Sequence, residues 1–453
     1  MKKTIILAVA LCMFYIGCSN FLEVDSPKDQ VDSLQTFNDE KTAVAAVNSA
    51  YILLIEDGFL GSMLTSNPIL SGCYTDELEV TMGGTADFKN FYDGSVTSTN
   101  NSVKQLWNKT YKQIYVVNNI LESLEISSGI SKSLKNQLRG EALAIRGLMH
   151  FYLTQTFGDV PFVSTTDYKV NMKIGKQSST EVMERSILDL EEAETLLISH
   201  YPGSERIRIN QSVVQAFLAR MYLYTGNWEK ARSYAELLID NSAYGLEKLE
   251  DVFKKDSKSA IWQLKPTMPG FNTFEAFYHI FTAVPAPFFK LNPSLLKAFE
   301  LADKRKEKWV NMVDGTDDYG HAFKYKIKGM SAITEEYTVV LRLEEMYLIA
   351  AEAAIMQDDL QTGSEILNVI RNRAGLNDLT FNNNQQALDA VLQERRIELF
   401  CEFGHRFYDL KRLNRLSELS VVKPQWQKYF SLYPLPENEI ILNPNLLPQN
   451  TGY

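Results

Sequence analysis

Apolar residues recur at three- and four-residue steps over long parts of the chain, which predicts a mainly helical protein. In residues 101–126 these steps run through Val103, Leu106, Trp107, Thr110, Ile114, Val117 and Leu121. The same spacing continues through residues 134–157 and stops at Gly158-Asp159-Val160-Pro161. A helix that buries one face shows this period. We therefore predict two long amphipathic helices, the second of which ends at the glycine.

Residues 179–240 continue the helical pattern. Ser179 or Thr180 is predicted to cap a helix that runs through His200 and ends at Pro202 and Gly203. Within residues 210–240 the offsets of a tetratricopeptide repeat are met by Leu218, Ala219, Tyr222, Gly226, Trp228 and Ala231. The two alanines let antiparallel helices approach, and the glycine supplies the turn.

A looser copy of this repeat occupies residues 341–370, where Asp358 stands in place of the turn glycine. Together with the helices of 101–157, the copies predict about four helix pairs. Helical repeats need stacked neighbours to bury their apolar faces. We therefore expect the pairs to pack as one continuous scaffold.

Two regions break the helical pattern, residues 58–100 and 241–340. They are rich in Gly, Pro, Asn, Thr and aromatic residues and predict loops, short helices and short strands, with one strand at 260–265. Such long insertions on a rigid scaffold usually carry function. We therefore expect the binding residues in these two regions.

The overall composition is that of a globular protein with a modest negative charge. The chain has 453 residues, of which 45% are hydrophobic and 23% charged, and its formal net charge is −10. A chain of this sign has no bulk attraction for nucleic acid or anionic lipid. We therefore predict neither as a primary partner.

The N-terminus predicts export and lipid anchoring. Two lysines precede an apolar run that is too short to span a bilayer, and Gly17-Cys18 follows it. We interpret residues 1–17 as a lipoprotein signal peptide, Cys18 as the lipidated residue and residues 18–35 as a tether. The alternative is an ordinary secretory signal with an incidental cysteine. Lipidation would leave Cys73 and Cys401 as free thiols, and Cys401 falls among apolar helix positions.

One charged stretch decides between an enzyme and a binding protein. Residues 394–412 read ERRIELFCEFGHRFYDLKR and predict a helix that breaks at Gly404 and resumes. His405 and Asp409, with Cys401 as nucleophile, would make a catalytic site. The other interpretation is a set of ion pairs that fix one helix against its neighbours. We favour the ion pairs and predict no catalytic residue.

The same stretch resembles the C-terminal signature of the SusD/RagB family, the surface nutrient-binding lipoproteins of Bacteroidota. Further motifs are similar to that family in the same order along the chain: LWNKTYKQIYVVNNIL (106–121), GEALAIRGLMHFYLTQTFGDVPF (140–162), NPSLLKAFELADKRKEKWV (292–310), VLRLEEMYLIAAEA (340–353), RNRAGL (371–376) and SLYPLPENEIILNPNLLPQNTGY (431–453). The resemblance spans nearly the whole chain after the signal peptide.

The resemblance implies an all-α, SusD-like domain over residues 18–453. Four tetratricopeptide-like pairs would lie within 101–157, 179–240 and 341–412, beside an irregular ligand-binding half. It also implies a lipid-anchored protein on the outer face of the outer membrane that captures oligosaccharides or, in some branches, peptides. Such proteins deliver the nutrient to a SusC-like TonB-dependent transporter, are not enzymes and need no cofactor.

Two stretches combine aromatic rings with polar groups, as a sugar site requires. The predicted ligand-binding residues are Tyr74, Asp76, Asp87, Phe88, Asn90 and Tyr92 in the first stretch, Trp262 in the predicted strand, and Asn272, Phe274 and Tyr278 in the second stretch. The resemblance singles out Asp76, which follows Thr75 where family members often carry a Ser/Thr-Asp pair. The alternative for many of the rings is packing in the core, and for Trp262 the core is the favoured interpretation.

Other chemistries find little support in the sequence. No Cys or His pair has zinc spacing, and DGTDDYG at 314–320 falls short of an EF-hand loop. A surface glycosidase would need the carboxylate of Asp76 to face that of Asp87 or Glu275, and no feature of the sequence indicates that arrangement. We expect no metal site, and the choice between oligosaccharide and peptide stays open.

Overall fold

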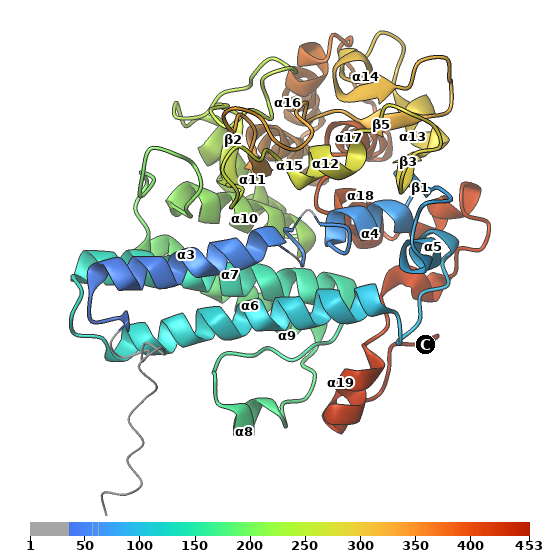
Figure 1. Ribbon diagram of the computed structural model, residues 1–453. Coiled ribbons are helices and arrows are strands. Elements are labelled where there is room, and N and C mark those ends of the chain that lie inside the picture. Colours follow the sequence, from blue (N-terminus) through green and yellow to red (C-terminus); the bar gives the residue numbers. More distant parts are fainter. Residues whose placement is uncertain (1–35, 57, 62) are drawn as a thin grey trace, which may run out of the picture.

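The computed structural model describes residues 36–56, 58–61 and 63–453. The predicted signal peptide, Cys18 and the tether lie outside the described residues. The described chain is mainly helical, with a few short strands paired in two-stranded sheets (Figure 1). The predicted all-α class with short strands is therefore confirmed.

Four long helices lie side by side and form the first layer (Figure 1). They are α3 (Glu40–Glu56), α6 (Asn101–Ile126), α7 (Lys132–Phe157) and α9 (Ser179–Leu196). The predicted helix at 101–126 matches α6, and α7 ends before Gly158, whose φ is +78°. The cap prediction for α9 is wrong by one residue, because Ser178 caps it in a box with Glu181. That helix also ends earlier than His200.

The chain continues into stacked helix pairs, in which α9 packs on α10, α10 on α11, and α11 on α15. These helices are α10 (Gln211–Tyr224), α11 (Trp228–Ile239), α15 (Leu343–Met356), α16 (Leu360–Arg373), α17 (Asn384–Glu398) and α18 (His405–Arg412). Ala219 and Ala231 are fully buried. Gly226 takes a φ of +74° at its turn, and Asp358 takes +64° at the equivalent turn. Aspartate tolerates this left-handed conformation better than most residues, so the looser copy keeps the repeat geometry.

The irregular half is built from short elements. Its helices are α4 (Asn67–Tyr74), α5 (Ala86–Asp93), α12 (Phe274–His279), α13 (Pro293–Ala298) and α14 (Lys304–Trp309). Its strands form three antiparallel pairs: β1 (Leu78–Val80) with β3 (Phe289–Leu291), β2 (Ala260–Leu264) with β6 (Thr338–Arg342), and β4 (Val310–Met312) with β5 (Gly320–Ala322). The predicted strand at 260–265 is confirmed as β2.

The C-terminal segment returns to the long helices. After α18 it forms 3₁₀ turns at Leu416–Val421, Lys428–Ser431 and Pro444–Leu446, together with the short helix α19 (Glu437–Leu442). In Figure 1, α19 lies below α6 beside α8 (Tyr168–Asn171).

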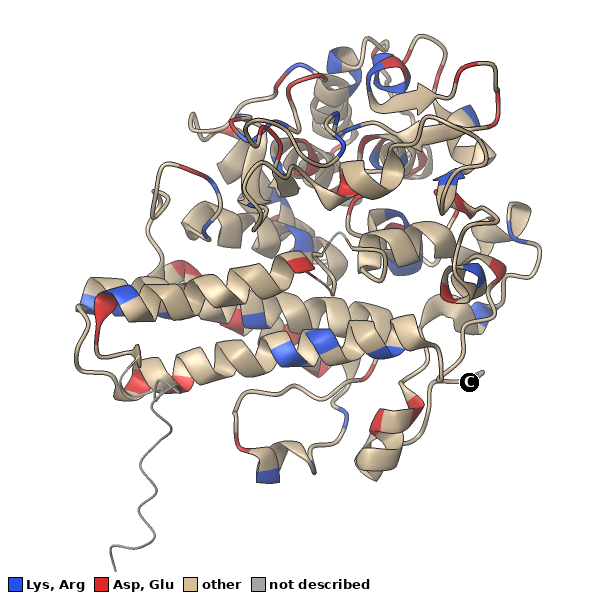
Figure 2. Ribbon diagram, viewed as in Figure 1, with Lys and Arg blue, Asp and Glu red and all other residues tan. Residues whose placement is uncertain are grey.

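Both signs of charge occur in the helical layers and in the irregular half (Figure 2). Among the described helices, none combines the length and apolar character needed to cross a membrane.

Candidate ligand-binding site

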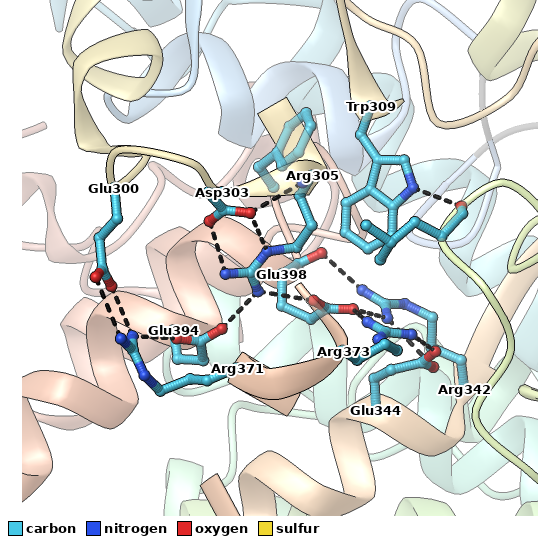
Figure 3. A network of polar contacts seen from close by, with 12 residues as sticks. Glu300, Asp303, Arg305, Trp309, Arg342, Glu344, Arg371, Arg373, Glu394 and Glu398 are labelled. Atoms are coloured by element: carbon cyan, nitrogen blue, oxygen red, sulfur yellow. Dashed lines mark hydrogen bonds and ion pairs between the residues drawn. The ribbon is translucent and has the colours of Figure 1, made fainter. Parts of the chain in front are cut away.

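The charged stretch 394–412 lies inside the protein, where it forms a network of ion pairs (Figure 3). Glu398 is fully buried, and its carboxylate lies 2.6 Å from Arg342, 2.5 Å from Arg373 and 2.9 Å from Arg305. Burial alone would raise the pKa of Glu398, but the three guanidinium groups hold it well below its usual value. The network ties α17 to α14, β6 and α16, which gives the stretch a structural role.

The turn between α17 and α18 is held by a buried lysine. Backbone φ angles there are positive at Cys401 (58°) and Gly404 (80°). The ammonium of Lys324 donates to the carbonyl oxygens of Glu398 at 2.8 Å and Phe400 at 2.9 Å. A non-glycine residue in this conformation costs about 1–3 kcal/mol and persists only when its surroundings fix it. Lys324 supplies part of that fixation.

The catalytic alternative for this stretch lacks access to solvent. Cys401, His405 and Asp409 are all buried. Burial lowers the pKa of His405 well below its usual value and raises that of the Cys401 thiol. The Asp409 carboxylate is occupied by Arg395 at 2.7 Å and Arg412 at 2.9 Å. These groups therefore favour the ion-pair interpretation, and Cys401 is the buried free thiol predicted from the sequence.

Asp76 is buried in ion pairs, contrary to our expectation of a ligand contact. It is 4% exposed, and its carboxylate lies 2.9 Å from Arg406 and 2.8 Å from Arg396. Burial raises its pKa, but Arg406 and then Arg396 outweigh burial and lower it. A carboxylate held in this way is neither a hydrogen-bond partner for sugar hydroxyls nor a general acid. The prediction of a ligand contact at Asp76 is corrected to a buried ion pair.

Three of the predicted ligand-binding rings belong to the core. Trp262 is fully buried, Tyr74 is 1% exposed and Phe88 is 2% exposed. The ring of Tyr74 lies 5.1 Å from that of Tyr433, and its hydroxyl donates to the carbonyl oxygen of Phe430 at 3.1 Å. The structure therefore corrects these rings from ligand contacts to packing, which is the alternative that the sequence offered for them.

Asn272 is buried as well, and its amide is occupied by its own chain. Its Nδ2 donates to the carbonyl oxygen of Gly329 at 3.2 Å and to Ser331 Oγ at 2.8 Å. Its Oδ1 accepts from the backbone N–H groups of Glu335 and Glu336 at 2.9 and 3.1 Å. Asn272 therefore fixes the loop after β5, and the prediction that it contacts ligand is corrected to this structural role.

Asp87, Asn90 and Tyr92 lie on α5 and are partly exposed. Asp87 accepts a hydrogen bond from Ser102 Oγ at 3.1 Å. The ammonium of Lys423 lies 4.0 Å from the centre of the Tyr92 ring and covers one of its faces. The α5 helix packs on α4 and β1. These three residues stay predicted ligand contacts.

The two irregular regions singled out in the sequence, residues 58–100 and 241–340, meet through β1 and β3. Glu79 pairs with Lys290 in this ladder, and Thr81 extends it with a 2.9 Å bond from its N–H to the carbonyl oxygen of Phe288. Gly83 lies so close to the facing loop that an added Cβ would sit 2.0 Å from the Pro287 oxygen. The glycine therefore allows this close backbone approach.

A cluster of rings reaches solvent next to this ladder, and we call it the α12 platform. Its members are Phe274, Phe277 and Tyr278 on α12 and Phe288 before β3. The centre of the Tyr278 ring lies 5.1 Å from that of Phe277, 6.2 Å from that of Phe274 and 6.0 Å from that of Phe288. Phe277 is 42% exposed, and the other three rings are partly buried. The platform thus offers contiguous aromatic surface. It includes Phe274 and Tyr278, two of the residues predicted to bind ligand.

Charged groups border the α12 platform. The ammonium of Lys328 donates to the carbonyl oxygen of Ile280 at 2.7 Å and lies 6.0 Å from the centre of the Phe277 ring. On the β1–β3 ladder, Lys290 lies 3.5 Å from Glu79 and 4.8 Å from the centre of the Tyr319 ring. The Lys328 ammonium can donate to oxygen atoms of a ligand that lies on the rings. Lys290 is 7% exposed, and its ammonium faces Glu79 and Tyr319 instead.

A small cavity lies behind α12, lined in part by Glu275, His279 and Lys324. Its volume of about 20 Å³ is room for a single water molecule rather than an organic ligand. Burial, and then the charge of His321, lowers the pKa of His279 to about 3, so its imidazole is neutral. Among the described residues, no group of three or more His, Cys, Asp or Glu side chains is placed to hold a metal ion.

Sequence reasoning missed two features of this surface. Phe288 belongs to the platform, and the double Phe at 288–289 next to a proline was the available signal. The loops around the platform also expose apolar side chains: Met82 is 95% exposed, Met330 65% and Val284 48%. No periodic pattern marks these isolated positions in a loop.

Comparisons with known proteins agree with this architecture. Residues 20–223 match a family model described as "Starch-binding associating with outer membrane", and residues 302–421 match the SusD family model. SusD-like protein P2 of Formosa agariphila is 25% identical over the whole of both chains. SusD-like protein P25 of the same organism is 23% identical over all of this chain and 99% of its own.

Solved structures share the fold. A SusD superfamily protein from Bacteroides vulgatus superposes with a TM-score of 0.80 at 21% identity, over 92% of this chain and 99% of its own. Surface glycan-binding protein A from Bacteroides uniformis gives 0.75 at 19% identity, over 91% and 99%. The two family models together cover most of the chain, in the order that the sequence motifs gave. The chain belongs to the SusD/RagB family.

Proposed function

We propose that this chain is a lipid-anchored, cell-surface binding protein that captures oligosaccharide on the α12 platform and passes it to a SusC-like TonB-dependent transporter. The observation that carries the proposal is the contiguous, partly exposed ring surface of Phe274, Phe277, Tyr278 and Phe288. Membership of the SusD/RagB family supports it, as does the glycan-binding protein among the structural relatives.

The chemistry of the surface suits a sugar. Ring faces cover the apolar faces of pyranose units, while hydroxyl groups need hydrogen-bond partners. Each hydroxyl buried without a partner costs about 1–3 kcal/mol. Lys328, beside the Phe277 ring, and Thr81, bonded to the backbone of Phe288, supply polar groups for that purpose.

One observation favours a peptide as the second candidate. Met82, Val284 and Met330 extend the ring surface with flexible or small apolar side chains. Such a surface adapts to varied apolar side chains, because methionine has three rotatable bonds and a polarisable sulfur. A glycosidase is disfavoured, since Asp76 is locked between two arginines and cannot pair with Asp87 or Glu275.

A binding assay tests the proposal on the purified mature chain. We expect members of a panel of neutral glucan, xylan and mannan oligosaccharides to bind without being hydrolysed. Phe277→Ala should weaken that binding about tenfold or more, because it removes an apolar ring worth roughly 1.5–3 kcal/mol when covered. Tyr168→Ala is the matched control, since Tyr168 on α8 is 69% exposed and lies outside the platform.

The outcomes separate the candidates. Binding of hydrophobic peptides but of no oligosaccharide would replace the first candidate with the second. Equal affinities of Phe277→Ala and the unmodified chain would remove the platform from either. Capture of the anchored protein from membranes together with a plug-bearing barrel tests the transporter partner, and labelling with palmitate that is lost in Cys18→Ser tests the anchor.

A further inference from the structure

A second concavity lies beneath α6, far along the chain from the α12 platform, and we call it the α6 cleft. Its lining residues come from α6, from the segment from Pro161 to Ile174 that carries α8, and from α19 with the turn after it. Figure 1 shows α8 and α19 below α6. Its volume is about 400 Å³, which lies in the range of small-molecule sites. It shares no residue with the α12 platform.

One wall of the α6 cleft is aromatic. Trp107, Tyr111 and Tyr115 follow one another at four-residue steps, so their rings line one side of α6. Trp107 is 3% exposed and Tyr115 is 50% exposed, so Trp107 lies deepest in the wall and Tyr115 lies at its solvent edge. The rings of Trp107 and Tyr111 lie 4.8 Å apart, and the Tyr111 hydroxyl donates to the Pro161 oxygen at 2.8 Å. The sequence analysis placed Trp107 among the packing positions of this helix and did not single out Tyr111 or Tyr115.

The facing wall is apolar and is fastened in place. Met172 and Ile174 contribute from the α8 segment, and Leu442 contributes from α19. Asn443 Nδ2 donates to the Ile174 oxygen at 2.8 Å, and Asn445 Nδ2 donates to the Lys173 oxygen at 3.0 Å. These two bonds join α19 to the α8 segment. The cleft is therefore already shaped before a ligand arrives, which reduces the ordering cost of binding.

The polar groups of the α6 cleft are hydrogen-bond acceptors and amides. Asn171 Nδ2 donates to the Thr165 oxygen at 2.8 Å, but its buried Oδ1 has no hydrogen-bond partner among the described residues. A buried acceptor left in this state costs about 1–3 kcal/mol, and a ligand donor would recover it once the Asn171 side chain turns its Oδ1 toward the cleft. Asn108 and Glu439 also line the cleft.

The charge of the lining narrows the ligand class. Among the described residues, the lining holds one carboxylate, that of Glu439, and no Lys, Arg or His. Such a lining repels anions, while stacked rings and amide oxygens accept a molecule with an apolar face and hydroxyl donors. A fatty or purely aromatic ligand would leave the Asn171 acceptor unpaired.

We propose that the α6 cleft is a second, separate binding site for a neutral saccharide of one or two rings. The sugar ring lies against Tyr111 and Tyr115, and a hydroxyl donates to Asn171 Oδ1. The proposal does not rest on the function proposed for the α12 platform, because the two sites share no residue and face different elements.

Methionine methyl groups give each site its own reporter. Met172 lines the α6 cleft, whereas Met82 and Met330 lie in the loops around the α12 platform. The full mature chain is labelled with ¹³C-methyl methionine, and the three signals are assigned with Met→Leu variants. Maltose, cellobiose, xylobiose and mannobiose are then titrated to about 50 mM, a concentration high enough to detect the weak binding expected of a disaccharide.

We expect at least one disaccharide to shift the Met172 signal in a saturable manner, in the unmodified chain and equally in Phe277→Ala. Tyr115→Ala should weaken this binding at least fivefold, and Asn171→Ala should weaken it as well, while Tyr168→Ala leaves it unchanged. Tyr115 is half exposed, so its truncation should not unfold the chain. An unfolded variant would be recognised from the loss of all dispersed methyl signals, and Tyr115→Phe then replaces it, with a weaker effect expected.

Three results would overturn the proposal. The first is the absence of any Met172 shift with all four disaccharides. The second is a Met172 shift that survives both Tyr115→Ala and Asn171→Ala. The third is a loss of transporter capture in Tyr115→Ala without any change in saccharide binding, which would make the cleft a protein-docking surface. Shifts of Met82 and Met330 alone support the α12 platform and reject the α6 cleft. A shift of Met172 alone supports the α6 cleft and rejects the α12 platform.

Discussion

The ion-pair network of α17–α18 and the α12 platform place side chains in opposite and unusual environments. In the network, charged groups are buried, and Glu398 alone contacts three arginines. In the platform, large apolar rings face solvent, with Phe277 42% exposed. The network pairs its charges within the chain, although both terminal nitrogens of the buried Arg395 have no hydrogen-bond partner among the described residues. The platform leaves apolar area uncovered, which is the state that a binding partner relieves. In this protein the dense charges are part of the folded core, and the exposed rings are the surface that we propose for binding.

The largest effect should come from breaking the network at its centre. Glu398→Ala leaves three buried guanidinium groups without their shared carboxylate, and we expect a loss of about 3–5 kcal/mol in the free energy of unfolding. Urea denaturation measures it. Glu398→Gln keeps the shape and removes the charge, so it serves where the alanine variant does not fold. The matched control is Glu125→Ala, whose carboxylate is 75% exposed in a 3.4 Å pair with Arg139 and should cost less than about 1 kcal/mol. Equal losses at the two sites would contradict the structural role.

A buried carboxyl beside the network should make stability depend on pH. Burial raises the pKa of Glu77 from 4.5 to about 7, against the lowering effect of the Cys401 N–H bond. Between these two pH values the folded protein holds a proton that the unfolded chain has released. The Glu77 contribution to stability is therefore complete below about pH 4.5 and is lost as the pH rises through 7.

Glu77→Gln removes this titration. Relative to the unmodified chain, the variant should gain on the order of 3 kcal/mol in the free energy of unfolding between pH 5 and pH 8. Urea denaturation at the two pH values measures the difference. Glu307→Gln, at a side chain that is 71% exposed, should show no such gain. Parallel pH profiles of Glu77→Gln and the unmodified chain would show that Glu77 is ionised in the folded state.

An intermediate effect should follow from separating the two loops that carry the platform. Gly83→Ala places a Cβ 2.0 Å from the Pro287 oxygen, so the loops must move apart. We expect about 1–3 kcal/mol of lost stability, as for overpacking elsewhere, together with weaker ligand binding. Gly203→Ala is the control, because no atom lies within 4 Å of its added Cβ. Ligand affinity that survives a destabilised Gly83→Ala would mean that the β1 loop is not part of the site.

The smallest effect on stability should come from the platform itself. Phe277→Ala removes a half-exposed ring and should change the free energy of unfolding by less than about 1 kcal/mol, while it weakens ligand binding about tenfold. Phe88→Ala, at a ring that is 2% exposed, should instead cost about 3–5 kcal/mol. Thermal unfolding and calorimetric titration separate the two effects. A large stability loss in Phe277→Ala would place that ring in the core.

The scaffold could be predicted from the sequence because its signals are local. The apolar period of 101–126 gave the bounds of α6, and Gly226 with Asp358 marked the turns of the repeats. The ion pairing of the charged stretch 394–412 could also be predicted, since charges spaced among apolar helix positions must pair when they are buried. The start of α17 was not visible, because Asn383 caps it ahead of the signature.

The site was harder to predict because exposure is a tertiary property. Tyr74 and Tyr278 look alike in sequence, yet one is enclosed by other rings and the other reaches solvent. Asp76 precedes a strand, as many ligand-binding residues do. The sequence around it does not predict its two arginine partners, which lie more than 300 positions away in the chain. The rings of the α6 cleft were not predicted either, since Trp107 has the spacing of a packing position and Tyr111 and Tyr115 fall between the apolar steps.

Hydrogen exchange with and without saturating oligosaccharide tests most directly whether the rings of the irregular half, rather than the charged signature, contact the ligand. Backbone amides of residues 78–84 and 274–289 should exchange more slowly in the complex, while those of residues 394–412 should be unchanged. Protection concentrated in 394–412, with none around α12, would contradict the assignment of structure to the network and of binding to the platform.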